Sequence, residues 1–566
     1  MKKCIIYILI ILILIGLFII IYNNKDEEES EILKANYTEE DFDDSWDNNA
    51  TDINLDNKSG KIEITNGGTY HITGTLNDGY LYVDTSDQVK LVLDNVNISS
   101  SNYAAIMIEN AAKTIITLAK SSDNYLKDGT NYNLTTTEDE PNRALFSKDN
   151  LTINGSGSLN ITASYEDGIV SKDGLIIVSG DIKIIANDDG IRGKDYVNIY
   201  DAKINIKSGS NAIKTTNTTD KNLGYILIEN GTFNIKATGD AIQAASNLQI
   251  NNGTFNIETG GGSDIASSIH NSWGMWDSST SNFDNSSAKG LKAENSLVLN
   301  SGTYNLDTSD DSIHSNNNIE INDGNYTISS GDDGIHGDTK LTINNGTITI
   351  NKSYEGLESS DITINNGNIS ITSSDDGINV AGGKDSSSMN GRPGENKLSS
   401  ASGSLNINGG SIIVDASGDG LDANGNIYMK QGKVIIYGPI DNANSSIDYD
   451  GKFQIDGGVL IATGPSGMLQ MSSSSSSINT IIATFSNKNA DTTITVSDDI
   501  EEILNITPPK SYSSLIFASA NIVTDKTYNI NCSNTSLTVT IEDTITTTGI
   551  KNNNTNKMGG MIPEKR

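Results

Sequence analysis

The sequence predicts an all-β protein whose central part is a parallel β-helix of about 22 residues per rung. Two different turn motifs recur with that period, and short runs rich in Ile, Thr and Val lie between them. Hydrophobic residues make up only 35% of the chain, while Gly, Asn, Ser, Thr and Asp are abundant. This composition fits many short strands joined by tight turns better than large helical domains.

The first repeated motif is a D-G-I-like turn, and its aliphatic residue serves as a marker. The marker occupies Ile169, Ile191, Ile213, Ile242, Leu291, Ile313, Ile335, Leu357, Ile378 and Leu421. Successive differences are 22, 22, 29, 49, 22, 22, 22, 21 and 43. The steps of 49 and 43 contain polar segments, starting at Gly260 and Ala381, that lack the strand pattern. We interpret both as insertions.

The second motif is an N-G-T-like turn whose glycine recurs independently. It occupies Gly231, Gly253, Gly302, Gly324, Gly346, Gly367, Gly409 and Gly432, and it keeps the same period and the same interruptions. A rung of 22 residues traces about 73 Å at about 3.3 Å per residue, enough for three short strands and their turns. A leucine-rich repeat is disfavoured because its L-x-x-L-x-L frame is missing.

The flanking regions give the domain organisation. Lys2 and Lys3 precede an uncharged run from Ile5 to Tyr22, which predicts an uncleaved membrane anchor at 1–22 with the rest of the chain outside the cell. We expect an acidic linker at 23–50, an N-terminal β region at 51–140 and the parallel β-helix at 141–471. A C-terminal β segment at 472–550, forming a small sandwich or cap, and a polar tail at 551–566 complete the chain.

The net charge and the cysteine count exclude a class of partner and a type of cross-link. The net charge of −34 argues against nucleic acid, because a polyanion would be repelled. Cys532 is the only cysteine outside the predicted anchor, which excludes an intrachain disulfide there. We expect a monomer.

Carboxylates collect two and three positions before the marker. Doubled pairs occur at Asp188 and Asp189, Asp310 and Asp311, Asp332 and Asp333, and Asp375 and Asp376. Residues at one repeat position stack about 4.8 Å apart in a β-helix, so a ladder of like charges calls for a counter-charge. Calcium is the predicted ion, because it accepts many oxygen ligands in irregular geometry. The alternative is that these aspartates only form tight turns.

The position after the marker changes from basic residues through histidine to acidic ones, and it includes Arg192, Lys292, His314 and His336. This graded column is a candidate ligand-binding surface, although a solvated face explains it as well. His314 and His336 lie one rung apart and could share a transition metal. No cysteine or third histidine converges on them, so a zinc site is not expected.

Trp273 and Trp276 lie in the first long insertion, between glycine and serine runs. Aromatic faces beside polar groups are typical of sugar-binding sites, which makes both residues candidate ligand contacts. Alternatively, the loop folds back and the tryptophans cover an open side of the stack.

Long segments resemble a known family. They include YEDGIVSKDGLIIVSGDIKIIANDDGIRGKDYVNI, SAKGLKAENSLVLNSGTY and SGDDGIHGD. These segments resemble the clostridial carbohydrate-binding β-helix family related to pectate lyases, and the resemblance covers roughly 52–548. It implies a right-handed parallel β-helix, bound calcium, and binding of cellulose or acidic plant polysaccharide at the bacterial surface.

Taken together, these observations predict a membrane-anchored polysaccharide-binding protein on the extracellular face of the cell membrane. One alternative is a calcium-dependent pectate or uronate lyase with Lys194, Lys289 or Lys292 as the base. Carboxylates near each lysine would keep it charged and a poor base unless it were desolvated. The other alternative is a structural or adhesive surface protein without a glycan ligand. We expect binding without catalysis.

Overall fold

The computed structural model describes residues 33–132, 141–265, 287–381 and 403–550. The chain divides into two compact units, Met1–Ala35 and Asn36–Arg566, and every element below belongs to the second. The predicted anchor at 1–22 and the polar tail at 551–566 lie outside the described residues. A search of the described ranges finds no helix with the length and apolar character needed to cross a bilayer.

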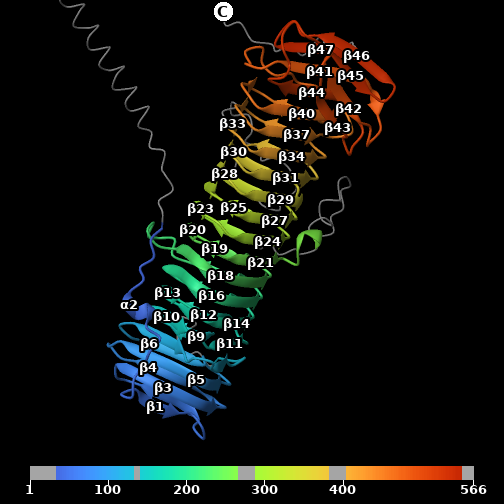
Figure 1. Ribbon diagram of the computed structural model, residues 1–566. Helices are drawn as coiled ribbons and strands as arrows, with labels where there is room; N and C mark the ends of the chain where they lie inside the picture. Colours follow the sequence, from blue (N-terminus) through green and yellow to red (C-terminus); the bar gives the residue numbers. More distant parts are fainter. Residues whose placement is uncertain (1–32, 133–140, 266–286, 382–402, 551–566) are drawn as a thin grey trace, which may run out of the picture. The chain divides into compact units, whose positions relative to one another are not determined.

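The all-β prediction is confirmed, and most strands belong to one 43-stranded sheet. Its strands pair in parallel with the strand one turn of the chain later, so that three ladders of strands run along the unit (Figure 1). We call the ladders the first, second and third face. Long strands such as β16 (Tyr196–Ser208) and β18 (Tyr225–Ala237) bend from the second face into the third.

The first face contains the D-G-I-like markers. Its strands are β2 (Gly60–Ile64), β4 (Gly79–Asp84), β6 (Ile106–Asn110), β9 (Arg143–Ser147), β12 (Asp167–Ser171), β15 (Ile191–Gly193), β17 (Ile213–Thr215), β19 (Ile242–Ala244), β22 (Leu291–Ala293), β25 (Ile313–Ser315), β28 (Ile335–Ile343), β30 (Leu357–Ile364), β32 (Ile378–Val380), β35 (Leu421–Ala423) and β38 (Ile447–Tyr449). The marker side chains of this face point into the core and are buried.

The second face follows it along the chain. Besides parts of β16, β18, β28 and β30, it consists of β1 (Thr51–Asn54), β3 (Gly68–Leu76), β5 (Val89–Ser99), β7 (Thr114–Leu118), β10 (Leu151–Gly155), β13 (Gly174–Ile177), β20 (Asn247–Ile250), β23 (Ser296–Leu299), β26 (Asn318–Ile321), β33 (Ser404–Ile407), β36 (Asn426–Met429) and β39 (Phe453–Ile455).

The third face begins after the N-G-T-like turns. Besides parts of β5, β16 and β18, it consists of β8 (Asp123–Lys127), β11 (Ser158–Ala163), β14 (Asp181–Ala186), β21 (Thr254–Thr259), β24 (Thr303–Thr308), β27 (Asn325–Ser330), β29 (Thr347–Lys352), β31 (Asn368–Ser373), β34 (Ser411–Ala416), β37 (Lys433–Tyr437) and β40 (Val459–Gly464). The glycines of the turns before it, among them Gly231 and Gly253, have φ of +140° and +137°, a region that side-chain-bearing residues rarely adopt.

The strand register confirms the alignment of the repeats. Ile169 pairs with Ile191, and each later marker pairs with the next one through to Leu421. Ile242 pairs directly with Leu291, and Ile378 with Leu421, so the steps of 49 and 43 residues are insertions between adjacent rungs. The insertions leave the register of the stack unchanged.

The predicted fold class needs correction. We expected a right-handed parallel β-helix at 141–471. Instead the strands wind around one core as a single closed sheet that begins at β1. The rungs before residue 141 escaped detection because their lengths are irregular: Ile62 pairs with Leu81, Leu81 with Ile106, and Ile106 with Leu145.

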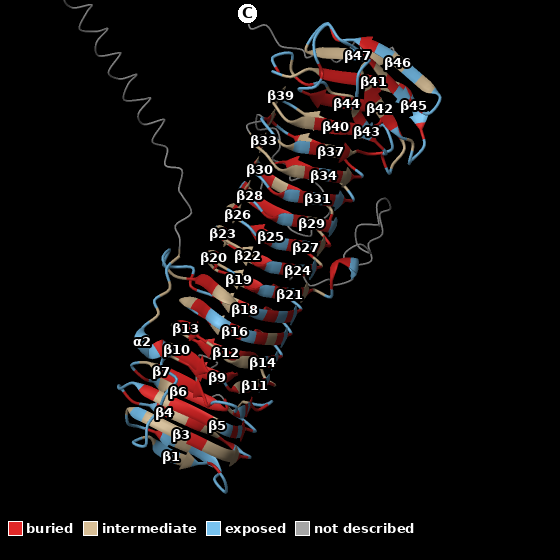
Figure 2. Ribbon diagram, in the orientation of Figure 1, coloured by how far each residue is buried: buried red, intermediate tan, exposed pale blue. Residues whose placement is uncertain are grey.

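One buried cluster fills the interior from Leu55 to Ala518. Buried and more exposed residues alternate along many strands (Figure 2), as expected where every second side chain points inward. Aromatic rings stack along the third face. The ring centroids of Phe233, Phe255, Tyr304 and Tyr326 follow one another at 4.6, 4.9 and 4.6 Å. This stack fixes the register of neighbouring rungs from the inside.

The C-terminal segment closes the stack. Strand β44 (Tyr512–Ser519) pairs with β40 in the antiparallel direction, and β41 (Thr480–Lys488) and β47 (Ile545–Gly549) extend the same sheet. A second, four-stranded sheet consists of β42 (Ile494–Ser497), β43 (Glu502–Ile506), β45 (Thr527–Cys532) and β46 (Thr535–Thr540). A separate hydrophobic cluster that includes Phe517 and Tyr528 joins the two sheets.

Near the start of the unit, a short helix docks on the side of the stack. This helix, α2 (Glu39–Phe42), lies within the predicted acidic linker. Its Asp41 is fully buried, 2.6 Å from Lys113 Nζ, and accepts a hydrogen bond from the Thr152 hydroxyl at 2.5 Å. The helix is therefore held in place by one buried carboxylate.

Candidate functional site

The doubled carboxylates lie at the corner that precedes the first face. We call the residues two positions before each marker the corner column. Its members are Asp167, Asp189, Asn211, Asp240, Lys289, Asp311, Asp333, Glu355, Asp376 and Asp419. The residues one position after each marker, which point to the same corner, form the neighbouring column. Its members are Val170, Arg192, Lys214, Gln243, Lys292, His314, His336, Glu358, Asn379 and Asp422.

A ladder of hydrogen bonds links the rungs along the corner column. The backbone N–H of Asp189 donates to Asp167 Oδ1 at 3.1 Å, and that of Asn211 donates to Asp189 Oδ1 at 3.0 Å. The same contact recurs from Asp333 N–H to Asp311 Oδ1 at 3.0 Å. One oxygen of each carboxylate thus accepts a hydrogen bond from the backbone N–H of the next rung, and the other oxygen can contact a positively charged group.

In the first half of the column, the counter-charges are arginine and lysine. Asp167 Oδ2 lies 2.6 Å from Arg192 Nη2 and 3.1 Å from Arg143 Nε. Asp189 Oδ2 lies 3.8 Å from Arg192 and 3.6 Å from Lys214. Burial raises the pKa of Asp167, and Arg192 opposes that effect. These aspartates therefore have cationic partners supplied by the chain itself.

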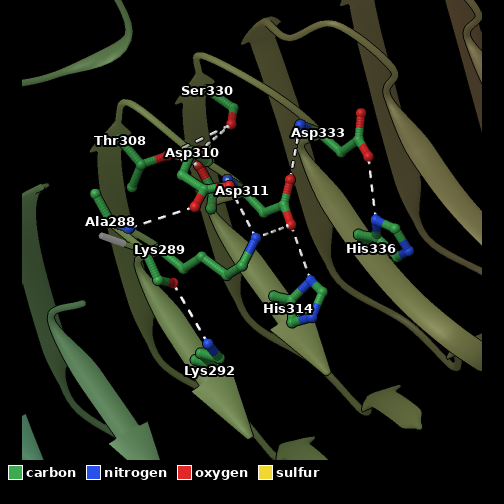
Figure 3. A network of polar contacts seen from close by, with 12 residues as sticks. Ala288, Lys289, Lys292, Thr308, Asp310, Asp311, His314, Ser330, Asp333 and His336 are labelled. Carbon is green, nitrogen blue, oxygen red and sulfur yellow. Dashed lines mark hydrogen bonds and ion pairs between the residues drawn. The ribbon is translucent and has the colours of Figure 1, made fainter. Parts of the chain in front are cut away.

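Lys289 takes the place of a carboxylate in the column and neutralises the next rung (Figure 3). Its side chain is 2% exposed, and Nζ lies 2.8 Å from Asp310 Oδ1 and 2.6 Å from Asp311 Oδ2. Burial alone would raise the pKa of Asp311, but Lys289 and His314 outweigh it and hold this pKa well below the ordinary value. Asp310 and Asp311 thus form a buried ion-pair cluster.

Two histidines follow in the neighbouring column, and both side chains are 4% exposed. His314 Nδ1 lies 2.8 Å from Asp311 Oδ2, and its Nε2 lies 2.8 Å from Asn316 Oδ1. His336 Nδ1 lies 3.2 Å from Asp333 Oδ2 and 3.3 Å from Glu358 Oε2. Each histidine is held by carboxylates of the corner (Figure 3).

Beyond His336, both columns lack lysine and arginine, and every member except Asn379 is acidic. Burial, with further contributions from Asp333 and Glu355, raises the pKa values of Glu355 and Glu358 well above their ordinary range. Burial and the charge of Asp375 raise the pKa of Asp376 to about 8, and burial raises that of Asp419 to about 6. No lysine or arginine among the described residues forms an ion pair with these carboxylates in the structure.

The acidic half contains a group of oxygen atoms suited to a cation. Carboxylate oxygens of Asp376, Asp419 and Asp422 lie within 4.8 Å of one another. Gly418 lies where Oδ1 of Asp375 and Oδ1 of Asp376 converge, and a Cβ on this glycine would overlap both oxygens. The backbone therefore leaves room beside two carboxylates that repel each other.

The doubled pairs predicted to bind metal fall in different surroundings. Asp188 joins Asp167 and Asp189, and Asp332 joins Asp310 and Asp311, in two further groups with convergent oxygens. Lysine and arginine already contact both groups. Asp333 contacts His336, whereas Asp375 and Asp376 lie in the part without such cations. The sequence analysis did not assign Asp419, Asp422 or Glu358 to a metal site, because none of them belongs to a doubled pair.

The predicted ligand-binding side chains are largely enclosed. Arg192 and Lys292 have side-chain exposures of 19% and 15% and point toward Asp167 and Asp240, while His314 and His336 are buried. These contacts place the four residues in the corner cluster. Trp273 and Trp276 lie outside the described residues.

The third face carries a feature that the sequence analysis missed. A groove of about 550 Å³ crosses β16, β18, β21, β24 and β27, lined by exposed Asn, Lys, Glu and Thr side chains. Asn234, Asn256 and Asn305 form a ladder along it, each side-chain N–H2 donating to the Oδ1 of the asparagine one rung earlier at 2.9 to 3.0 Å. The asparagine three residues after Gly231, Gly253 and Gly302 was the available signal.

The comparison with known proteins places this geometry in a family. The model of carbohydrate-binding domain-containing proteins matches residues 58–334 and 332–377. The chain belongs to this family. The matched residues include the groove and the corner columns as far as Asp376, whereas Asp419 and Asp422 lie beyond them.

Two individual proteins are similar to parts of the chain. A carbohydrate-binding domain-containing protein of Acetivibrio thermocellus is 37% identical over 143 residues, which cover 24% of this chain and 50% of that protein. The chain thus spans about half the length of this curated relative. A solved structure, a gadolinium derivative of the polysaccharide lyase-like protein from C. thermocellum, is 36% identical, covers 36% of this chain and 83% of its own, and has a TM-score of 0.35.

Proposed function

We propose that this chain is a cell-surface polysaccharide-binding protein that contacts the glycan along the third face and binds calcium in the acidic half of the corner column. The observation that carries the proposal is the groove of about 550 Å³, whose lining residues lie between Ile206 and Ser329, within the part that matches the carbohydrate-binding family. The predicted anchor at 1–22 would hold the protein on the extracellular face of the membrane.

The groove has the chemistry that sugar hydroxyls require. Asn234 and Asn256 each use one N–H and the Oδ1 within the ladder, so a second N–H and an oxygen lone pair of each remain for a ligand. Lys236 and Glu258, which form an ion pair at 2.6 Å, add a charged donor and acceptor. Because the rungs repeat every ~4.8 Å, the same polar groups recur along the groove, as a polymer of similar units requires.

Calcium is supported by the donor set of the acidic half. Asp375, Asp376, Asp419 and Asp422 offer only oxygen, and calcium takes six to eight oxygen ligands without strict geometry. Burial and neighbouring carboxylates raise the pKa values of Asp376 and Asp419, so a bound cation would favour their charged forms. When bound, the ion would supply that charge and cross-link two successive rungs.

An acidic glycan is the finer proposal. A protein with a net charge of −34 repels a polyuronate, and calcium shared between protein and sugar carboxylates would remove that repulsion. Cellulose, which is neutral, would need calcium only through the stability of the fold.

Pull-down of the full chain on insoluble cellulose and on calcium-free, cross-linked polygalacturonate gel tests both parts. We expect Asn256→Ala with Asn305→Ala to reduce retention at least fivefold. Asn365→Ala with Asn408→Ala, which alters the same kind of ladder outside the groove, should leave retention unchanged. Equal retention of both double variants would reject the groove.

The proposed calcium site is tested with a chelator and with one glycine variant. Gly418→Ala should abolish calcium binding, measured by titration calorimetry, because the new Cβ occupies the space between Asp375 and Asp376. If polygalacturonate binding persists in chelator while the protein remains folded, the bridging role is wrong. In that case, retention of the groove variants on cellulose is the remaining test of the groove.

A further inference from the structure

We propose that Asp333, His336 and Glu358 form a binding site for a transition-metal ion such as Zn²⁺, separate from the calcium site. The proposal concerns the middle of the corner, between the lysine- and arginine-containing half and the acidic half. It is independent of glycan binding. It also revises the expectation that no zinc site would form, because carboxylates supply the ligands that cysteine or a third histidine would otherwise provide.

The three ligand atoms come from adjacent rungs and converge. His336 Nδ1 lies 3.2 Å from Asp333 Oδ2 and 3.3 Å from Glu358 Oε2. Zinc binds nitrogen and carboxylate oxygen at about 2.0 to 2.2 Å, so two ligands on a tetrahedral ion lie roughly 3.4 Å apart. Both separations match ligands that share one ion, and they are long for a charge-assisted hydrogen bond.

A carboxylate also lies on the opposite side of the imidazole ring. His336 Nε2 faces Asp338 Oδ1 at 3.5 Å, and that oxygen is buried without a hydrogen-bond partner. When an ion occupies the site, the Nδ1 lone pair would face the ion and the proton on Nε2 would face this carboxylate. A carboxylate behind a metal-binding histidine commonly orients the ring in this way.

A buried amide oxygen in the adjoining strand also lacks a hydrogen-bond partner. Asn379 pairs with Glu358 in the adjoining strand and is only 6% exposed. Its side-chain N–H2 donates to Glu355 Oε2 at 2.7 Å, while its Oδ1 is buried and has no hydrogen-bond partner. A buried acceptor without a partner is unfavourable, and a positive ion bound nearby would stabilise it.

The rung before this cluster provides a contrast within the same columns. His314 stands in the same relation to Asp311 as His336 does to Asp333, with Nδ1 to Oδ2 distances of 2.8 and 3.2 Å. Asp311, however, also contacts the Lys289 ammonium at 2.6 Å. The chain itself supplies a cation at His314, whereas two carboxylates face His336 from adjacent rungs.

The donor types distinguish this site from the calcium site. An imidazole nitrogen with two carboxylate oxygens suits zinc, manganese, iron or nickel, while calcium and magnesium prefer oxygen alone. The group of Asp376, Asp419 and Asp422 contains only oxygen donors. The two sites therefore select different ions even though they share one corner of the fold.

Zinc titration of the chelator-stripped full chain, in a large excess of calcium, tests the proposal by calorimetry. We expect uptake of Zn²⁺ at this site with a dissociation constant below 10 μM (about −7 kcal/mol), and loss of this binding by at least tenfold in Glu358→Gln and in His336→Asn. His314→Asn is the matched control and should retain it. Co²⁺ should give the visible absorption bands of a four- or five-coordinate nitrogen and oxygen site in the wild-type chain and in His314→Asn.

The variants decide whether Asp333, His336 and Glu358 hold the ion. Each variant is included only if its circular dichroism spectrum matches that of the wild-type chain, and Glu358→Gln preserves size and hydrogen bonding should His336→Asn fail this criterion. Absence of zinc uptake, uptake that calcium displaces, or uptake that Glu358→Gln leaves unchanged would each overturn the proposal. Equal loss in His314→Asn would do the same.

Discussion

The two halves of the corner column share one backbone and differ in how their charge is balanced. From Asp167 to Asp311, carboxylates contact Arg143, Arg192, Lys214 and Lys289. From Glu355 to Asp419, the same ladder of N–H to carboxylate contacts continues, as between Asp419 N–H and Asp376 Oδ1 at 2.6 Å. Backbone pairing and core packing therefore determine the ladder of hydrogen bonds in both halves, whereas the source of the neutralising positive charge differs between them.

The largest effect is expected from removing the buried cation of the first half. Lys289→Met leaves Asp310 and Asp311 buried without their ammonium partner, and breaking a buried ion pair on one side costs about 3 to 5 kcal/mol. Thermal and urea unfolding of the full chain measure the loss. A destabilisation below about 1 kcal/mol would mean that His314 or water compensates, and that Lys289 does not sustain this half of the column.

In the acidic half, we expect the effect of a substitution on stability to change sign when calcium is added. In chelator, Asp376→Asn should stabilise the protein by on the order of 2 kcal/mol, because it removes one of several repelling carboxylates and keeps the oxygen that accepts the Asp419 N–H. With saturating calcium, the same substitution should destabilise, because a ligand is lost. Melting temperatures with and without calcium give the sign, and a shift in the same direction in both conditions contradicts the calcium site.

The acidic half should also control the pH dependence of stability in chelator. The folded pKa values of Asp376 and Asp419, about 8 and about 6, lie above the ordinary value, so the folded state binds more protons than the unfolded state between about pH 4 and pH 8. Their contribution to stability is complete below about pH 4 and is lost as the pH rises through this window.

Calorimetric melts from pH 4 to pH 8 measure that loss. Asp376→Asn should flatten the decline, and calcium should remove most of it. A wild-type profile that matches the variant's in chelator would show that Asp376 does not titrate in this range.

The smallest effect is expected at the surface. Lys236 and Glu258 form an ion pair at 2.6 Å, with side chains that are 60% and 37% exposed. Lys236→Met should change stability by less than about 1 kcal/mol, because solvent and salt screen exposed pairs. This variant is the control for Lys289→Met, and a comparable loss at both sites would remove the distinction between buried and exposed cations.

The sequence predicted the alignment of the repeats correctly, but not the residue at which the repeated strands begin. The alignment from Ile169 to Leu421 is correct because one core position per rung must be aliphatic, and a period is visible wherever that position is regular. The rungs before Arg143 follow the same pairing but vary in length, so no period reveals them. Strand direction and continuity depend on distant backbone contacts that no local pattern encodes.

The candidate site was predicted in part. The aspartates stood out because doubled carboxylates are unusual, but their partners depend on which side chains face the same corner. The sequence analysis considered Lys289 only as a candidate base, and its contacts with Asp310 and Asp311 emerge from the stacking. Likewise, the contacts of Glu358 with His336 and of Asn379 with Glu355 could not be predicted from the sequence.

The antiparallel strand β44 has a consequence for assembly. A stack of parallel rungs presents unpaired amide and carbonyl groups at its last strand, which another chain could extend into a fibril. Here β44 covers β40 in the reverse direction, and the four-stranded sheet beyond packs on that side. The reversal replaces the template for a further parallel rung, so the C-terminal end of the stack is protected against head-to-tail polymerisation.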